Sequence, residues 1–221
     1  MPELAMKKLC VLTCVLAALG AGAGLAQNLG IFTNEGSVGA TPPGVKASYD
    51  ASKGEYRITG GGANMWSTTD AFYFVWKQMS GDMRLSADIE WVGTSAAEHR
   101  KAVLIIRQSL EPNSAYADAV SHGNGLTSLQ FRGAAGEQTY QVFTNIEGKA
   151  HLEIVREGSR FTMYAGKPGE EPKMVGPVEY VSLRDPVYVG LGVCSHVATT
   201  LETAIFSNVK LEQSPTAVSS R

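Results

Sequence analysis

The fold is decided by residues 84–91, whose sequence is Arg84-Leu85-Ser86-Ala87-Asp88-Ile89-Glu90-Trp91. Apolar and polar side chains alternate along this stretch. Successive side chains of a strand point to opposite faces, so Leu85 and Ile89 share one face while Asp88 and Glu90 share the other. This alternation predicts a β-strand with one face in a core and the other toward solvent.

The same pattern continues outward from this stretch, over residues 44–213. Turns such as Ser80-Gly81-Asp82 and Gly123-Asn124-Gly125 interrupt it about every ten residues, as in all-β sandwiches. No apolar stripe at helical spacing lasts longer than about two turns. We therefore predict an all-β chain, an antiparallel β-sandwich. The predicted strands are 45–49, 55–59, 72–79, 83–92, 101–109, 116–122, 126–132, 139–144, 151–157, 160–165, 187–195 and 203–212.

Composition agrees with a globular β-rich domain. Of the 221 residues, 44% are hydrophobic, 18% are charged and 24 are glycine, which is costly inside helices. Lys and Arg number 19 against 21 Asp and Glu, a net charge of −2. Without a basic excess the chain lacks the charge that holds a phosphate backbone, so we expect no nucleic-acid partner.

The two ends of the chain predict export and a small polar tail. Residues 1–26 combine Lys7 and Lys8, an apolar run over 9–19, and small residues before Gln27. That order is typical of a signal peptide and too short to span a bilayer. We expect a secreted or periplasmic protein, a flexible polar lead-in over 27–43 and a disordered tail over 214–221.

Cys194 is the one cysteine that would survive removal of the signal peptide, since Cys10 and Cys14 lie within it. A single cysteine forms no internal disulfide, so the core depends on packing. Cys194 follows an apolar strand pattern, which favours a buried residue over a nucleophile or metal ligand.

Three segments carry a resemblance to a known family. They are residues 56–66 with 70–74 and 81–82, residues 101–110 with 113–115, and residues 187–196 with 204–209. Together they are similar to the secreted concanavalin A-like (laminin G-like) jelly-roll domains grouped as DUF1349 and regulation-of-enolase-protein-1-like. In bacteria these domains are often joined to TolB-type propellers or glycan-active enzymes. The resemblance implies a concanavalin A-like jelly roll and leaves the function open, because the family mixes carbohydrate-related and adhesive members. One local departure is His99-Arg100 before Lys101, where similar domains often have a tryptophan.

The candidate ligand-binding residues form a face rather than a motif. Polar side chains of three predicted strands point away from the buried side. We expect aromatic residues of neighbouring segments to flank these polar side chains. Sugar sites combine such polar groups with aromatic surfaces. The alternative is cross-strand ion pairing on an exposed sheet. The candidates are Trp66, Asp70, Tyr73, Asp88, Glu90, Lys101, Arg107, Gln130 and Arg132, with Trp76 as a further possible wall.

Catalytic and metal signals are weak. Asp88 and Glu90 lie two residues apart, and the rise of a strand would separate their carboxyl groups by about 6–7 Å. Retaining glycosidases have two carboxyl groups about 5–5.5 Å apart. The Glu-x-Asp-x-x-Glu pattern of jelly-roll glucanases does not occur. The four histidines show no ligand spacing, and a single Ca²⁺ at Asp70 or Asp82 is an alternative left open by the resemblance. The run 60–62 lacks the residues of a phosphate loop and predicts a turn.

Three functional hypotheses follow. The first is a secreted, monomeric, non-catalytic binding module for carbohydrate or another extracellular polymer, which uses the polar face and needs no cofactor. The second is a structural or protein-interaction domain of the bacterial envelope, in which the same charges are ion-paired. The third is a glycoside hydrolase that uses Asp88 and Glu90.

Overall fold

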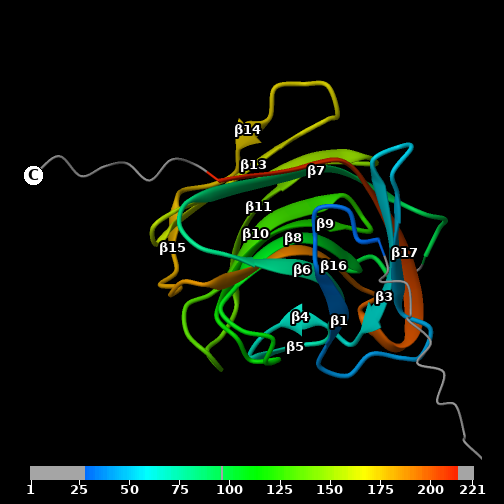
Figure 1. The fold of residues 1–221 in the computed structure, drawn as a ribbon, viewed down its shortest axis with the longest axis horizontal. Helices are drawn as coiled ribbons and strands as arrows, with labels where there is room; N and C mark the ends of the chain where they lie inside the picture. The colour runs from blue at the N-terminus through cyan, green and yellow to red at the C-terminus, as the bar shows by residue number, and fades with distance from the viewer. Residues whose placement is uncertain (1–27, 96, 214–221) are drawn as a thin grey trace, which may run out of the picture.

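A computed structural model of the chain describes residues 28–95 and 97–213. Two antiparallel sheets stack on each other (Figure 1), and the described residues include no helix. The all-β antiparallel sandwich predicted from the sequence is confirmed. The predicted signal peptide and tail lie outside the described residues.

The seven-stranded sheet contains the strands that matter for the site. Its order is β1-β6-β16-β8-β9-β10-β11, with every neighbouring pair antiparallel. The bounds are β1 Asn34–Val38, β6 Phe72–Met79, β16 Val187–Cys194, β8 Lys101–Arg107, β9 Tyr116–His122, β10 Leu126–Arg132 and β11 Tyr140–Asn145.

The eight-stranded sheet covers one face of the first sheet. Its order is β14-β13-β12-β7-β17-β3-β2, with β15 also paired to β13. The bounds are β2 Lys46–Asp50, β3 Glu55–Gly62, β7 Met83–Trp91, β12 Ala150–Glu157, β13 Arg160–Gly166, β14 Lys173–Met174, β15 Glu179–Tyr180 and β17 Val197–Gln213.

The main core lies between the sheets and follows the predicted alternation. Leu85 and Ile89 of β7 are fully buried against residues such as Leu104 of β8. Strand β8 is buried along its whole length, as expected for a central strand covered on both faces. Its other face belongs to a second, smaller core that includes Val103 and Ile105.

A short hairpin supplies the cover for that second core. It consists of β4 (Met65–Trp66) and β5 (Thr69–Asp70), paired with each other. Figure 1 shows it on the side of β8–β10 opposite to β7 and β13. The hairpin therefore covers part of the outer face of the seven-stranded sheet (Figure 1).

Two predictions about the first half of the chain are wrong. The segment predicted as a flexible lead-in contains β1, which pairs with β6 and completes the edge of the seven-stranded sheet. The glycine run predicted as a turn ends strand β3 instead. Gly60 and Gly62 are required there because a Cβ would overlap the carbonyl oxygens of Val193 and Ala71. The sandwich interior, rather than a turn, excludes side chains at these positions.

Candidate functional site

The β4–β5 hairpin is fastened to the sheet by Asp70. Arg132 of β10 donates two hydrogen bonds to this carboxylate, Nη1 to Oδ2 at 2.9 Å and Nη2 to Oδ1 at 2.8 Å. Arg107 of β8 adds a longer contact to Oδ2 at 3.5 Å. All three side chains are completely buried. A bidentate arginine–carboxylate pair of this kind fixes geometry as well as charge.

The two arginines also bond loop carbonyls, while Arg107 Nη1 has no hydrogen-bond partner among the described residues. Arg132 also bonds the carbonyls of Ser67 and Ser114, and Arg107 bonds those of Ser109 and Glu111. Asp70, Arg107 and Arg132, predicted as ligand-binding residues, are thus placed as residues that hold the hairpin and nearby loops. Burial raises the pKa of the Asp70 carboxyl, and the hydrogen bonds from Arg132 oppose that rise.

Beside this network the hairpin leaves a hollow of about 230 Å³ above the sheet. We call it the histidine hollow, since three histidines line it. Its walls and floor come from the hairpin, β8–β11 and the loops that lead into β8 and β17. The lining residues are Asn64, Trp66, His99, Lys101, His122, Leu126, Gln130, Gln141 and His196.

Lys101 connects the hairpin to the floor of the histidine hollow. Its ammonium donates to Asn64 Oδ1 at 2.8 Å and to the Met65 carbonyl at 2.6 Å. The Nζ atom lies 5.5 Å from the centre of the Trp66 ring, within cation–π range. An ammonium has three donors, so one remains after these two bonds among the described residues.

The floor keeps polar atoms without partners. His122 and Gln130 are almost fully buried, and they contact each other through Nε2 atoms 3.5 Å apart. His122 Nδ1 and Gln130 Oε1 have no hydrogen-bond partner, and neither does either oxygen of the neighbouring Asp118. Buried polar groups are almost always paired, so the unpaired atoms of His122 and Gln130 make this hollow the candidate binding site.

Burial also sets the charge of the floor. It lowers the pKa of His122 to about 3, so the imidazole is neutral and offers hydrogen bonds rather than charge. It raises the pKa of Asp118 well above its ordinary value, with the nearby Lys101 opposing that rise. Burial lowers the pKa of Lys101, and the neighbouring Cys194 and Asp118 oppose this decrease. The thiol of Cys194 is itself buried, with its pKa raised to about 11, as the apolar strand pattern predicted.

The histidines of the hollow could not be found from their spacing. His99, His122 and His196 come from three separate loops and strands, yet their rings lie 5.9 Å (His99–His122) and 5.7 Å (His99–His196) apart. Burial lowers the pKa of His196 as well. The one local signal in the sequence was that His99-Arg100 precede Lys101, where similar domains often have a tryptophan.

Of the nine predicted ligand-binding residues, Trp66, Lys101 and Gln130 line the histidine hollow. Tyr73 does not, because alternation along β6 turns its ring into the core between the sheets. Trp76 does lie on the outer face, stacked on Phe74 with ring centres 5.1 Å apart, but outside the hollow. The parity of β6 therefore gives its aromatics two different environments.

Asp88 and Glu90 lie on the other side of the sandwich, so the expected shared face with Lys101 does not form. Strand β7 belongs to the eight-stranded sheet. There Asp88 accepts hydrogen bonds from His151 Nδ1 at 2.7 Å and Asn208 Nδ2 at 2.8 Å. Glu90 is exposed beside Lys149. The hollow around Asp88, about 370 Å³, is lined by groups that mostly satisfy one another.

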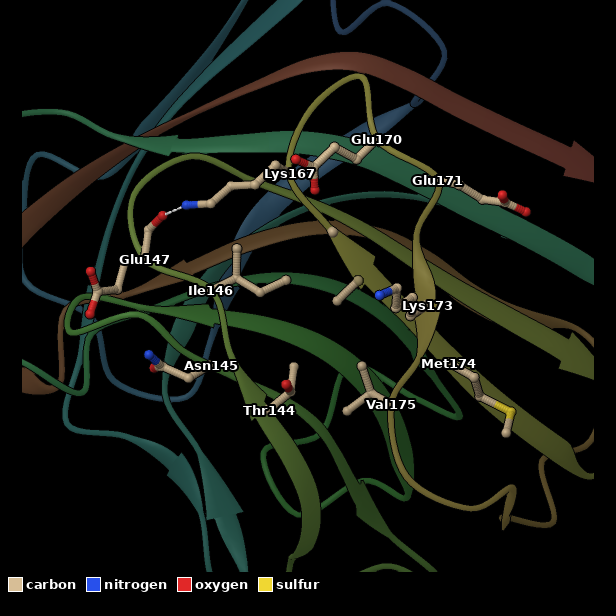
Figure 2. A pocket seen from close by; sticks show the side chains of 12 residues that line it. Thr144, Asn145, Ile146, Glu147, Lys167, Glu170, Glu171, Lys173, Met174 and Val175 are labelled. Atoms are coloured by element: carbon tan, nitrogen blue, oxygen red, sulfur yellow. Dashed lines mark hydrogen bonds between the residues drawn. The ribbon is translucent and has the colours of Figure 1, made fainter.

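A larger hollow, about 520 Å³, lies near the ends of β11 and β13. Figure 2 shows Lys167 reaching the backbone of Glu147 at one end, while Glu171 and Met174 point away. Its charged side chains are exposed, and no buried polar side chain lines it. It offers space without fixed polar groups, which distinguishes it from the histidine hollow.

The metal-ligating side chains of the described residues are dispersed. No three His, Cys, Asp or Glu side chains in residues 28–95 and 97–213 are arranged to hold a metal ion. Both oxygens of Asp70 are taken by Arg132, and Asp82 accepts from the Gly158 backbone. The same residues contain no helix with the length and hydrophobicity to cross a bilayer.

Comparison with known proteins shows the fold. No protein-family model and no curated protein matches the sequence. A functionally unknown protein from Saccharomyces cerevisiae superposes with a TM-score of 0.60 at 12% identity, over 79% of this chain and 94% of its own. The carbohydrate-binding module CBM66 from Bacillus subtilis gives 0.51 at 17% identity, over 83% of this chain and 98% of its own.

A third similar structure is an enzyme. The xylan β-1,4-xylosidase from Bacillus halodurans C-125 gives a TM-score of 0.54 at 18% identity over 76% of this chain. This chain spans about a third of the xylosidase, 34% of its length. At these identities the likeness establishes a shared β-sandwich.

Proposed function

We propose that the protein is a non-catalytic carbohydrate-binding module whose site is the histidine hollow. The observation that carries the proposal is the set of buried, unpaired polar atoms on His122 and Gln130, which line the same hollow as the partly buried Trp66. A sugar presents an apolar ring face to an aromatic side chain and hydroxyls to fixed donors and acceptors. The fold shared with the CBM66 module supports it.

The size of the histidine hollow suits a short stretch of a polymer. About 230 Å³ is below the about 300–1,000 Å³ of pockets that enclose a drug-sized ligand. A site this small holds one sugar unit while the rest of the chain runs over the surface. Export through residues 1–26, expected from the sequence, would place the module outside the cytoplasm where such polymers occur.

The test is binding of the purified chain to a glycan array, followed by titration of the best ligand. Trp66→Ala should weaken that affinity at least thirtyfold, about 2 kcal/mol, as for a central aromatic anchor. Tyr180→Ala is the matched control, because Tyr180 is an exposed aromatic far from the hollow in the fold. Absence of any glycan ligand, or equal effects of the two variants, would contradict the proposal.

A protein-interaction role is the second candidate, favoured by exposed apolar side chains at the ends of both sheets. Tyr140 and Phe143 on β11, Met174 on β14 and Tyr180 on β15 are each more than half exposed. Strand β11 is also an edge strand with unpaired backbone groups, which pair readily with another chain. In this case Tyr180→Ala, and not Trp66→Ala, would reduce co-purification with an envelope protein.

A further inference from the structure

The charges around the histidine hollow are unbalanced. Three buried cations, Lys101, Arg107 and Arg132, share the outer face of the seven-stranded sheet with two buried carboxyls, Asp70 and Asp118. Arg132 and Asp70 pair directly. With three basic side chains against two carboxyls, this face carries one more basic than acidic group.

The lining of the hollow repeats this imbalance. Its nine lining residues include one lysine, three histidines and three side-chain amides, but no aspartate or glutamate. By contrast, the hollow around Asp88 on the opposite sheet contains Asp88, Glu153 and Glu212 beside its basic groups. The histidine hollow therefore has donors and one cation to offer, and it lacks the carboxylates that usually accept hydrogen bonds from neutral sugar hydroxyls.

The position of Lys101 relative to Trp66 further restricts the chemical class of the ligand. A sugar ring stacked on Trp66 would lie beside the ammonium, which is held by Asn64 and the Met65 carbonyl and has one donor left. A carboxylate on that ring would take this donor in a charge-assisted hydrogen bond, about twice as strong as a neutral one. The amides of Gln130 and Gln141 would remain for the ring hydroxyls.

We propose that the histidine hollow selects a sugar that carries a carboxylate, that is, a uronate unit of an acidic polysaccharide. This inference rests on the proposed function and specifies its ligand. The carboxylate pairs with Lys101, the ring stacks on Trp66, and the neutral imidazoles and amides take the hydroxyls. A neutral hexose in the same place offers the third donor of Lys101 a hydroxyl oxygen, which is a weaker acceptor than a carboxylate.

The experiment compares pairs of oligosaccharides that differ in the carboxylate. Trigalacturonate is titrated against galactotriose, and trimannuronate against mannotriose, by calorimetry at constant ionic strength. At least one acidic member should bind ten times or more tighter than its neutral counterpart. The decisive variant is Gln141→Glu, which adds a negative charge to the lining while its oxygen can still accept from Gln130 Nε2, now 3.3 Å from Gln141 Oε1.

Gln141→Glu should weaken acidic binding and lower the ratio of acidic to neutral affinity at least tenfold, because the added negative charge acts on the carboxylate of the ligand. Gln78→Glu is the matched control: it makes the same charge change at an exposed position on β6 of the same sheet, outside the hollow, and should change neither. Lys101→Met should likewise abolish the acidic preference, with circular dichroism to confirm folding. Because Gln141 is only partly buried, its variant keeps the test decisive if Lys101→Met fails to fold.

The outcomes separate this inference from the proposed function. If neutral ligands bind as tightly as acidic ones, or if Gln141→Glu leaves the ratio unchanged, the uronate assignment is overturned. In either case a loss of binding in Trp66→Ala would still uphold the glycan module. If no glycan binds at all, both proposals fail together.

Discussion

The outer face of the seven-stranded sheet has two ends that use buried polar residues in opposite ways. At one end Arg132 donates hydrogen bonds to both oxygens of Asp70 and to loop carbonyls. At the other end His122 and Gln130 keep polar atoms unpaired beside a hollow. Both ends cost desolvation energy, which the Asp70–Arg132 pair offsets at the first end with hydrogen bonds within the chain. The paired end therefore stabilises the hairpin, while the unpaired end is the one proposed as the ligand site.

The largest expected effect comes from breaking the paired end. Asp70→Ala leaves Arg132 buried without its carboxylate, and the loss of one partner of a buried pair costs about 3–5 kcal/mol. Denaturant unfolding should show this decrease in the free energy of unfolding. Glu90→Ala, which removes an exposed carboxylate, should change it by less than about 0.5 kcal/mol. A similar small change in Asp70→Ala would mean that the network does not hold the fold.

The second effect tests the unpaired end through pH. Burial lowers the pKa of folded His122 to about 3, below its ordinary 6.5. Between these pH values the unfolded chain binds a proton that the folded chain does not, so stability falls as the pH falls. The His122 contribution is up to about 1.4 kcal/mol per pH unit, or about 2.5 kcal/mol between pH 6 and pH 4.

His122→Gln, which does not titrate, should remove this part of the slope. The measurement is the free energy of unfolding of both proteins at several pH values between 4 and 6. Since other groups titrate identically in the two proteins, the difference in slope belongs to His122. Parallel curves would show that the imidazole is not buried in its neutral form.

The smallest expected effect on stability comes from a change at Gln130, and it tests most directly whether the unpaired end serves binding rather than folding. Gln130→Met replaces a buried amide whose contacts are long, 3.3 Å to Gln141 and 3.5 Å to His122, with an apolar side chain of similar length. Removing a poorly satisfied polar group is nearly neutral, so the free energy of unfolding should change by less than about 1 kcal/mol. Glycan affinity should nevertheless fall about tenfold. A large loss of stability would place Gln130 with the structural residues instead.

Strand parity explains how far the sequence predicted the site. Alternation along β8 and β10 put Lys101, Arg107, Gln130 and Arg132 on one face, and the register with β9 confirms that they share it. Alternation could not show that β7 enters the other sheet, so Asp88 and Glu90 were grouped with the wrong face. It also could not show that the hairpin would seal Arg107 and Arg132 away from solvent.

The three histidines of the hollow were missed because strand alternation could not predict that they lie together. His99 and His196 lie in irregular segments, where no periodicity fixes the direction of a side chain. Their approach to His122 depends on strand order, since β8 lies between β16 and β9 and brings the ends of all three together. The β4–β5 hairpin that carries Trp66 is likewise too short to give an alternating pattern.

The sequence by itself determined the period-two alternation, and with it the strands, the inward-facing residues and the antiparallel sandwich. These follow from local geometry, because each residue's face depends only on its place along its own strand. The tertiary structure alone decided which strands are neighbours and what covers each face. Those contacts join residues far apart in the chain, so only the assembled sheets separate the buried Asp70 network from the hollow beside Lys101.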